Sequence, residues 1–346
     1  MMDTSNAIVE IRLTDGLESW ANGLALAPAA GGLDLESDPP NPHVAFRAMG
    51  CTVRAEVASL DPRAQTPLEQ VSALFETWES SLTRFRPDSE LCRLNERAGE
   101  TVAVGPVLWE VIQASIRAAR ISDGLVTPMV LRALQAAGYD RPFDELRGED
   151  HPPVRSAVPV ADWREIVLNP ADRTVRLPLG GRLDLGGVGK GWAAEQAADR
   201  LKSLGPVMVN AGGDIAFSGR WQGSRPWMIG VADPRRPERE LTTLAIWSGG
   251  VATSGTDFRR WTAGGVEQHH LIDPRTGAPA ESDVLSATVV APSLMIAEVA
   301  AKVAILLGSR DGLAWIESQP DLAGLLVLVN GETLESRRLA QHVWRA

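Results

Sequence analysis

Apolar side chains recur every three to four residues in four stretches of the chain, which is the spacing of an amphipathic helix. The predicted helices cover residues 67–82, 106–121, 192–204 and 293–307. Gly308 directly follows the last periodic stretch, and a glycine just past the last turn commonly ends a helix. The pattern therefore predicts four long helices, with a stop at Gly308.

Shorter apolar or alternating runs predict strands between these helices. A hairpin is expected over residues 44–57 with its bend at Gly50, and a second over 164–178 around Asn169-Pro170. Residues 232–239 are charged and predict a loop. Further strands are expected at residues 183–185, 207–209, 227–231 and 244–254.

The stretch from Arg182 to Ile215 places a glycine turn on either side of the third helix and its following strand. Free N–H groups in such turns, together with the positive end of a helix, attract anions. Lys190 would add a positive charge there and Asp184 a carboxylate. The spacing fits neither a Walker A loop nor a dinucleotide fingerprint, because Asp184 and Trp192 stand where these motifs require glycine. A plain glycine-rich turn with a surface lysine is the alternative.

Composition narrows the function classes. The 346 residues are 44% hydrophobic and 23% charged, which is typical of a soluble globular protein. The net charge of -10 argues against a nucleic-acid partner, since nucleic-acid binding needs a concentrated positive field. Cys51 and Cys92 are too few for a disulfide framework and predict two buried thiols. No apolar run suggests membrane insertion, and the N-terminus lacks a signal-peptide pattern, so a cytoplasmic location is expected.

Four motifs occur in one order along the chain: DLGGVGKG, VNAGGD, TSG and HLIDPRTG. This order resembles the ApbE family of FAD:protein FMN transferases, and the resemblance runs from about residue 46 to residue 308. It implies an α+β fold related to the T-fold, with antiparallel sheets, packed helices and two intertwined subdomains that hold FAD in the cleft between them. It also implies a flavin transferase domain over residues 44–346, preceded by an extension and linker over residues 1–43. The first twenty residues fit either a short strand or a helix.

The resemblance implies a set of flavin-binding positions. Met49 stands where the family has a methionine that contacts the flavin, and Phe85 where it has an aromatic ring that packs on the isoalloxazine. Thr127 replaces a family aspartate, so only the backbone there is expected to line the adenine side. The remaining positions implied for the flavin or its pyrophosphate are Asp184, Lys190, Gly212, Gly213, Asp214, Thr253, Ser254, Gly255 and Ile272.

The motif HHLIDPRTG carries two of the implied catalytic residues. His270 aligns with the family histidine, and a histidine beside a pyrophosphate can donate a hydrogen bond or a proton to the leaving oxygen. His269 is the extra histidine, and adjacent side chains on an extended segment point to opposite faces, so only one should line the pocket. Asp273 would hold the turn or orient the acceptor. The alternative is a capping Asp-Pro turn with a hydrogen-bonded histidine.

The last predicted helix departs from the family pattern. In metal-dependent members this helix supplies an aspartate and a threonine to Mg²⁺, together with a backbone carbonyl of the glycine turn. Aligned on the closing Leu-Gly, the corresponding residues are Glu298, Lys302 and Gly187. A charged lysine cannot ligate Mg²⁺. Either the Lys302 ammonium replaces the metal, or Mg²⁺ binds elsewhere with Glu298 as surviving ligand, or the two form an i,i+4 pair on an exposed face. We favour replacement, because Ile305 on the same face suggests that this face is covered.

The resemblance implies a reaction in which a Ser or Thr of an acceptor flavoprotein attacks the FMN phosphorus of FAD and AMP leaves. The alternatives are an FAD-binding protein without transferase activity, and a hydrolase that splits the FAD pyrophosphate with water. The chain contains no acceptor motif of the Asp-Gly-x-x-Thr kind, so the acceptor is expected to be another protein.

Overall fold

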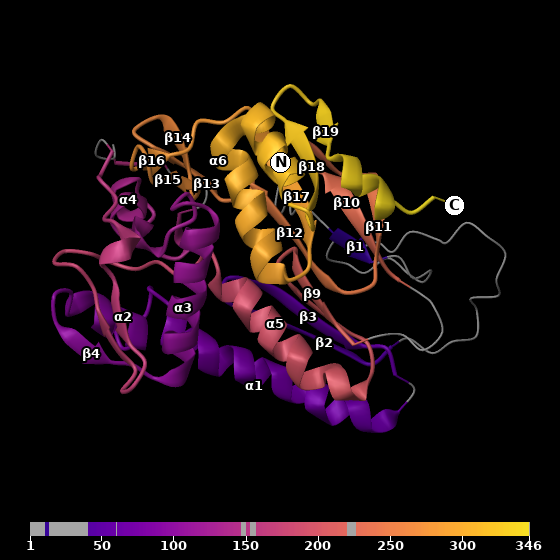
Figure 1. The fold of residues 1–346 in the computed structure, drawn as a ribbon, viewed down its shortest axis with the longest axis horizontal. Coiled ribbons are helices and arrows are strands. Elements are labelled where there is room, and N and C mark those ends of the chain that lie inside the picture. The colour runs from indigo at the N-terminus through magenta and orange to yellow at the C-terminus, as the bar shows by residue number, and fades with distance from the viewer. Residues whose placement is uncertain are drawn as a thin grey trace.

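The computed structural model describes residues 11–13, 41–59, 61–146, 150–152, 157–219 and 226–345. Its centre is an eight-stranded sheet in which every neighbouring pair is antiparallel (Figure 1). The sheet mixes strands from distant parts of the chain, and its antiparallel pairing agrees with the expected α+β fold. In spatial order they are β19 (Thr333–Glu335), β18 (Ala323–Leu328), β17 (Val284–Ala291), β12 (Gly249–Gly255), β9 (Asp214–Ser218), β8 (Val207–Ala211), β3 (Cys51–Val57) and β2 (His43–Ala48).

Three long helices cover one face of this sheet, as Figure 1 shows. They are α1 (Gln65–Leu82) over β2 and β3, α5 (Gly189–Leu201) over β8 and β9, and α6 (Leu294–Ser318) over β12, β17 and β18. Alanines dominate the buried side of α5, and their small side chains let the helix backbone approach the strands closely. The main hydrophobic core lies in this layer.

A second sheet covers the opposite face. It consists of β1 (Ile11–Leu13), β10 (Trp227–Asp233) and β11 (Arg236–Ile246). Within β8, Val207 and Val209 belong to the core under the helices, whereas Met208 packs in the core between the two sheets. Because side chains alternate between faces and both faces are covered, the first three residues of this strand, 207–209, are all apolar.

A second region is built from two insertions into the large sheet. The first, after α1, holds α2 (Glu90–Glu96), α3 (Pro106–Ile121), α4 (Leu131–Ala136) and the sheet of β4 (Thr101–Ala103), β7 (Thr174–Arg176) and β6 (Val167–Asn169). The second lies between β12 and β17 and holds β13 (Arg260–Ala263), β14 (Val266–His269), β15 (Ile272–Asp273) and β16 (Ala278–Pro279), with β5 (Asp150–His151) pairing to β13. Short 3-10 turns cover Pro62–Ala64, Pro128–Val130, Phe143–Glu145, Trp163–Glu165, Lys202–Leu204 and Arg337–Gln341.

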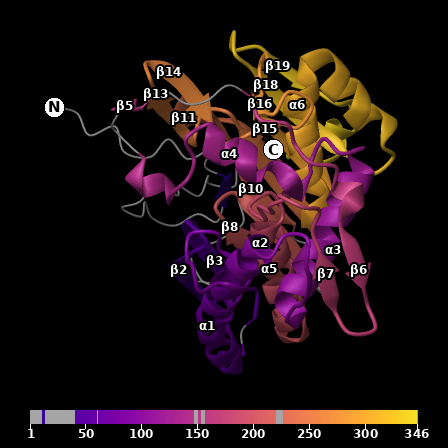
Figure 2. The ribbon, with the colours of Figure 1, turned by 90° about the vertical axis from the view of Figure 1, so that its left-hand side faces the viewer.

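The two insertions meet at one small core. Trp261 of β13 donates its indole N–H to the carbonyl of Ala137, just after α4, over 2.8 Å. Its ring packs on Tyr139, with the centroids 5.3 Å apart. Figure 2 shows α4 beside β15 and β16. The chain therefore enters this region twice, and the two subdomains are intertwined as expected.

The predicted helices are all present, with changes at their ends. The helix over residues 106–121 has the expected bounds, while α5 begins at Gly189, inside the glycine turn, and ends at Leu201. Gly308 interrupts α6 with a φ of 80°, as expected, but a further helical segment continues to Ser318. Asp283 accepts a bond from the Ser309 N–H over 2.8 Å and so caps this second segment.

The strand expected at residues 183–185 is wrong. Leu183 and Leu185 are buried, but the backbone between them joins no strand. The side chain of Asn95 takes the partner's place: its Oδ1 accepts from the Leu183 N–H over 2.7 Å, and its Nδ2 donates to the Leu183 carbonyl over 2.9 Å. Alternating apolar residues correctly predict that this segment is buried. Its backbone N–H and carbonyl groups, however, form hydrogen bonds with a side-chain amide and not with a neighbouring strand.

The loop expected at residues 232–239 is also wrong. β10 runs to Asp233 and β11 begins at Arg236, so the hairpin turns tightly, with the Asp233 carboxylate accepting from the Arg235 N–H over 3.0 Å. The charged side chains that suggested a loop stand on the exposed start of an outer strand.

Part of the expected extension is structured. Residues 11–13 pair with β10, so this segment is a strand, whereas residues 1–10 and 14–40 lie outside the described part of the chain. The linker and the domain boundary at residue 43 therefore remain predictions. Among the described helices, none has the length and apolarity to cross a membrane.

Candidate functional site

Two tight hairpin turns lie side by side at one end of the large sheet. Met49 and Gly50 join β2 to β3 with φ values of 51° and 68°, and Gly212 and Gly213 join β8 to β9 with values of 67° and 96°. Left-handed backbone at both central positions defines the type I′ turn. The Gly212 N–H donates to the Thr52 carbonyl over 3.0 Å, so the second turn is fastened to the first.

Close packing determines the residue types in these turns. A Cβ at position 212 would lie 2.7 Å from the Cβ of Cys51, which leaves room only for glycine. Met49 adopts a conformation that is uncommon outside glycine, and its N–H donates to the Glu79 carboxylate of α1 over 2.9 Å. Burial raises the pKa of the Cys51 thiol, which donates to the Ala48 carbonyl. Both cysteines are free and half-buried.

The first glycine turn reaches the second through an ion pair. Lys190, in the first turn of α5, contacts the carboxylate of Asp214, which follows Gly213 and is buried. Burial opposes the charge on Lys190, but the carboxylates of Asp214 and Glu298 prevail and raise its pKa above the ordinary value. Lys190 is therefore charged, and its charge is already compensated by a carboxylate.

A second buried ion pair lies next to the first. Lys302 contacts Glu298 Oε1 over 3.0 Å, and only 1% of the Glu298 side chain and 14% of the Lys302 side chain are exposed. A Cβ at position 187 would lie 3.8 Å from Lys302 Cε, so the lysine stem lies along the Gly187 backbone. A Cβ at position 191 would lie 2.5 Å from Glu298 Oε2, so α5 carries glycine there. The structure thus brings Gly187, Glu298 and Lys302 together, and the exposed i,i+4 pair is wrong.

These residues do not fit a magnesium ion. Mg²⁺ requires several oxygen ligands in near-octahedral geometry. Glu298 Oε2 is buried with no hydrogen-bond partner among the described residues, but Oε1 of the same carboxylate already holds an ammonium. No group of three or more His, Cys, Asp or Glu side chains in the described part of the chain could hold a metal. The positive charge at this place belongs to Lys302.

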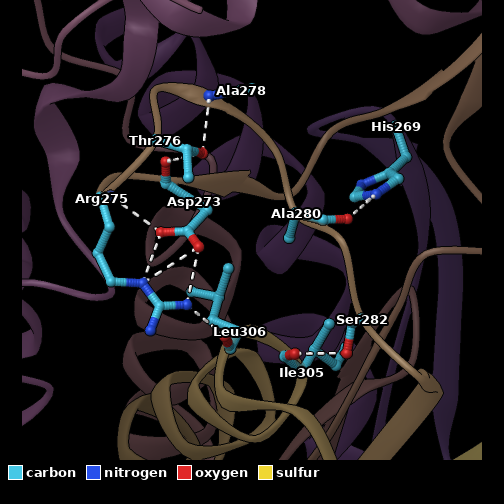
Figure 3. Close-up of polar contacts among 9 residues, drawn as sticks. All are labelled: His269, Asp273, Arg275, Thr276, Ala278, Ala280, Ser282, Ile305 and Leu306. Atoms are coloured by element: carbon cyan, nitrogen blue, oxygen red, sulfur yellow. Dashed lines mark hydrogen bonds and ion pairs between the residues drawn. The ribbon is translucent and has the colours of Figure 1, made fainter.

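The two histidines divide between structure and site. Nδ1 of His269 accepts from the Leu271 N–H over 3.3 Å, and its Nε2 donates to the Ala280 carbonyl over 2.9 Å (Figure 3). His270 makes no such bonds, and its buried Nδ1 has no partner among the described residues. Burial holds the pKa of His270 well below 6.5, and Arg259, His269, Lys302 and Lys190 lower it further, in that order. His270 is therefore neutral at neutral pH.

Asp273 holds a turn. Its carboxylate accepts from the Arg275 N–H over 2.9 Å and pairs with the Arg275 guanidinium over 2.7 Å. The guanidinium also donates to the Leu306 carbonyl over 2.6 Å, and Ser282 donates to the neighbouring Ile305 carbonyl, so both satisfy the end of the first segment of α6 (Figure 3). Of the two roles expected for Asp273, the geometry favours holding the turn.

A further group of expected residues surrounds an arginine that the sequence did not single out. Asp184 pairs with Arg84 over 2.7 Å, with only 6% of the Arg84 side chain exposed. The Arg84 guanidinium lies 4.2 Å from the centre of the Phe85 ring and 4.4 Å from that of Tyr139. Thr127 caps the turn at residues 128–130 through the Met129 N–H. The Asp184 carboxylate is thus already paired with a cation of the protein. In the sequence, the only signal for a role of Arg84 is its position directly before Phe85.

The remaining expected residues lie on β12 and β15. Thr253 Oγ1 is 2.8 Å from Thr288 Oγ1 on β17, while Ser254 is buried on the other side of the strand. A Cβ at Gly255 would lie 2.1 Å from Oδ1 of Asp257, a buried carboxylate without a partner among the described residues. The Ile272 side chain is buried in the small core that also contains Trp261, so any contact with the flavin would have to come from its backbone.

Comparison with known proteins agrees with this architecture. The FAD:protein FMN transferase of Treponema pallidum is 28% identical over 315 residues, 85% of this chain and 86% of that protein. That of Vibrio cholerae is 28% identical over 312 residues, 87% of this chain and 91% of that protein. The crystal structure of the ApbE protein of Thermotoga maritima superposes with a TM-score of 0.76 at 26% identity, covering 88% of this chain and 99% of that one.

The sequence model described as the ApbE family matches residues 49–326, which include both type I′ turns, both buried ion pairs and His270. The chain therefore belongs to the ApbE family.

Proposed function

We propose that this protein is an FAD:protein FMN transferase that moves FMN from FAD to a Ser or Thr hydroxyl of an acceptor flavoprotein. The hydroxyl oxygen attacks the FMN phosphorus, the bond to the bridging oxygen breaks, and AMP leaves with that oxygen. The relatives named FAD:protein FMN transferase support this assignment. The observation that carries it is the cluster of two buried ion pairs beside a neutral His270 whose Nδ1 has no hydrogen-bond partner among the described residues.

His270 supports the proton transfer. A neutral imidazole whose Nδ1 has no partner among the described residues can accept the proton that the attacking hydroxyl loses, and the negative pyrophosphate of bound FAD would offset the repulsion between the nearby cations and the imidazolium so formed. Of the two roles expected for His270, donating a hydrogen bond to the leaving oxygen remains possible, because a neutral imidazole has one N–H. Donating a proton to that oxygen is replaced by accepting one, and this proton comes from the hydroxyl of the acceptor protein.

Lys302 supplies a fixed positive charge where metal-dependent members are expected to hold Mg²⁺. Its ammonium is anchored on Glu298 and lies along Gly187, next to Lys190. Charges held in place before the reaction stabilise the phosphoryl oxygens without reorganisation. We therefore propose that transfer in this chain does not require Mg²⁺.

The cytoplasmic location remains a prediction, and cell fractionation would test it.

Product analysis tests the function. Purified protein is incubated with FAD and an acceptor domain that carries a threonine flavinylation site, and AMP, free FMN and in-gel flavin fluorescence of the acceptor are measured. Stoichiometric AMP and fluorescent acceptor are expected. Free FMN with AMP would support the hydrolase instead, and bound FAD without AMP across several acceptors would support a binding protein.

A further inference from the structure

The charges around His270 do not cancel. Lys190 is paired with Asp214, and Lys302 with Glu298, so these four side chains have no net charge. His270 is neutral because burial and nearby cations lower its pKa. A third cation, Arg259, belongs to the same surroundings, since its charge acts on His270, Lys190 and Cys51. Together these groups carry one excess positive charge.

Arg259 lies between the two parts of the site. It directly precedes β13, and its carbonyl accepts the N–H of His270 over 3.3 Å. Its guanidinium extends to the Met49–Gly50 turn, where a Cβ at position 50 would lie 3.8 Å from Nη2. The half-buried side chain therefore reaches from the His270 segment to the turn at the end of β2 and β3.

Within the described part of the chain, the guanidinium makes no hydrogen bond, ion pair or ring contact. The neighbouring Arg260 behaves differently, because it is exposed and paired with Glu267 of β14. An arginine that is held in a charged, half-buried site without an internal anion is suited to an external one, and its planar fork fits phosphate oxygens.

We infer that Arg259 binds a phosphate group of the flavin nucleotide, which adds a phosphate-binding residue to the site. The inference rests on the proposed function for the identity of the nucleotide. The two lysines are already paired with carboxylates and hold the site in position, whereas Arg259 is, among the described residues around His270, the cation that the ligand can still neutralise. It also predicts that the phosphate lies against the Met49–Gly50 turn, on the same side as His270.

Equilibrium binding separates a phosphate contact from other roles. Dissociation constants for FAD, FMN, AMP and riboflavin are measured by fluorescence titration and calorimetry with wild type, Arg259→Gln and Arg259→Lys. Loss of a charge-assisted bond predicts that Arg259→Gln binds FAD about ten- to a hundredfold more weakly, while riboflavin, which has no phosphate, binds as before. Arg259→Lys is expected to recover part of the loss. Comparing FMN with AMP shows which phosphate is contacted.

Arg260→Gln is the matched control, since it removes an arginine one residue away that already has a partner, and it should leave all four constants unchanged. Equal weakening of FAD and riboflavin by Arg259→Gln would overturn the inference, and so would unchanged FAD binding. If wild type binds FAD but releases no AMP, the proposed function fails while the inference on Arg259 still stands or falls by these constants. Absence of FAD binding in wild type would overturn both.

Discussion

The imidazole of His270 sits among three cations, and this environment determines its protonation state. Because the folded-state pKa lies below 6.5, the basic form is already fully present at pH 7. If His270 accepts the proton of the acceptor hydroxyl, the transfer rate should stay level from about pH 8 down to about pH 6.5 and fall only below that. A rate that rises as the pH drops through 6.5 would contradict a neutral base.

His270→Ala should lower the rate of AMP release by about a hundredfold, because proton transfer by a positioned side chain contributes about this much. The affinity for FAD, measured by fluorescence titration, should change much less. His269→Ala is the contrasting variant: it removes two backbone contacts and should lower the free energy of unfolding by about 1–3 kcal/mol. Parallel loss of rate and FAD affinity in His270→Ala would make His270 a binding residue only.

Lys302→Thr tests whether the ammonium stands in for a metal. The change removes the ammonium that contacts Glu298 Oε1 and puts a hydroxyl at position 302, so the Glu298 carboxylate and this hydroxyl become available to a cation beside Gly187. AMP release by this variant should become stimulated by Mg²⁺ and sensitive to EDTA. Lys202→Thr serves as control, since Lys202 pairs with Asp199 on the exposed end of α5. If Lys302→Thr responds to Mg²⁺ as the wild type does, the hypothesis that the Lys302 ammonium replaces the metal is wrong.

Among the secondary-structure elements, the two type I′ turns are the most constrained. Gly212→Ala would combine a φ of 67° with a Cβ placed 2.7 Å from Cys51. Gly50→Ala has nearly the same φ, 68°, but only an ordinary contact at 3.8 Å. The first change should cost about 2–4 kcal/mol of unfolding free energy and the second about 1–2 kcal/mol. Denaturant unfolding of both variants gives the comparison, and equal losses would mean that packing between the turns adds nothing.

Hydrophobic periodicity predicts helices and strands well where one face is apolar. It predicts them less well where a side chain, and not a neighbouring strand, forms the hydrogen bonds of a buried backbone segment. The helices over residues 67–82 and 106–121 and the hairpin at Gly50 follow directly from alternation and spacing. The segment at Leu183 looks like a strand because it is buried, but Asn95, 88 residues earlier, satisfies its backbone. A partner so distant in sequence leaves no local pattern.

The fold as a whole explains why only part of the site could be predicted. Motif order places Gly187, Lys190, Asp214 and His270 in one family site, and the alignment of the last helix on its closing Leu-Gly adds Glu298; the structure brings these residues together. The pairings of Arg84 with Asp184 and of Arg275 with Asp273 and Leu306 arise from contacts between the insertions and the large sheet. Arg259 is one of two adjacent arginines in the sequence, and the fold distinguishes them: Arg259 is half-buried at the Met49–Gly50 turn without an ion-pair partner among the described residues, whereas Arg260 is exposed and paired with Glu267.

The protein carries a net charge of -10, yet the site concentrates three cations around one histidine. Such a site binds an anionic nucleotide through local charge and not through the field of the whole surface. The account therefore depends on these cations, and above all on Lys302, being sufficient for the reaction.

The most direct test is the initial rate of AMP release by the wild-type protein, with FAD and an acceptor domain, in EDTA and in Mg²⁺. If Lys302 supplies the charge, the two rates should agree within about twofold, and flavin fluorescence should appear on the acceptor in both. A rate that disappears in EDTA and returns with Mg²⁺ would contradict the account, because it would show that the buried ion pair of Glu298 and Lys302 does not replace the metal.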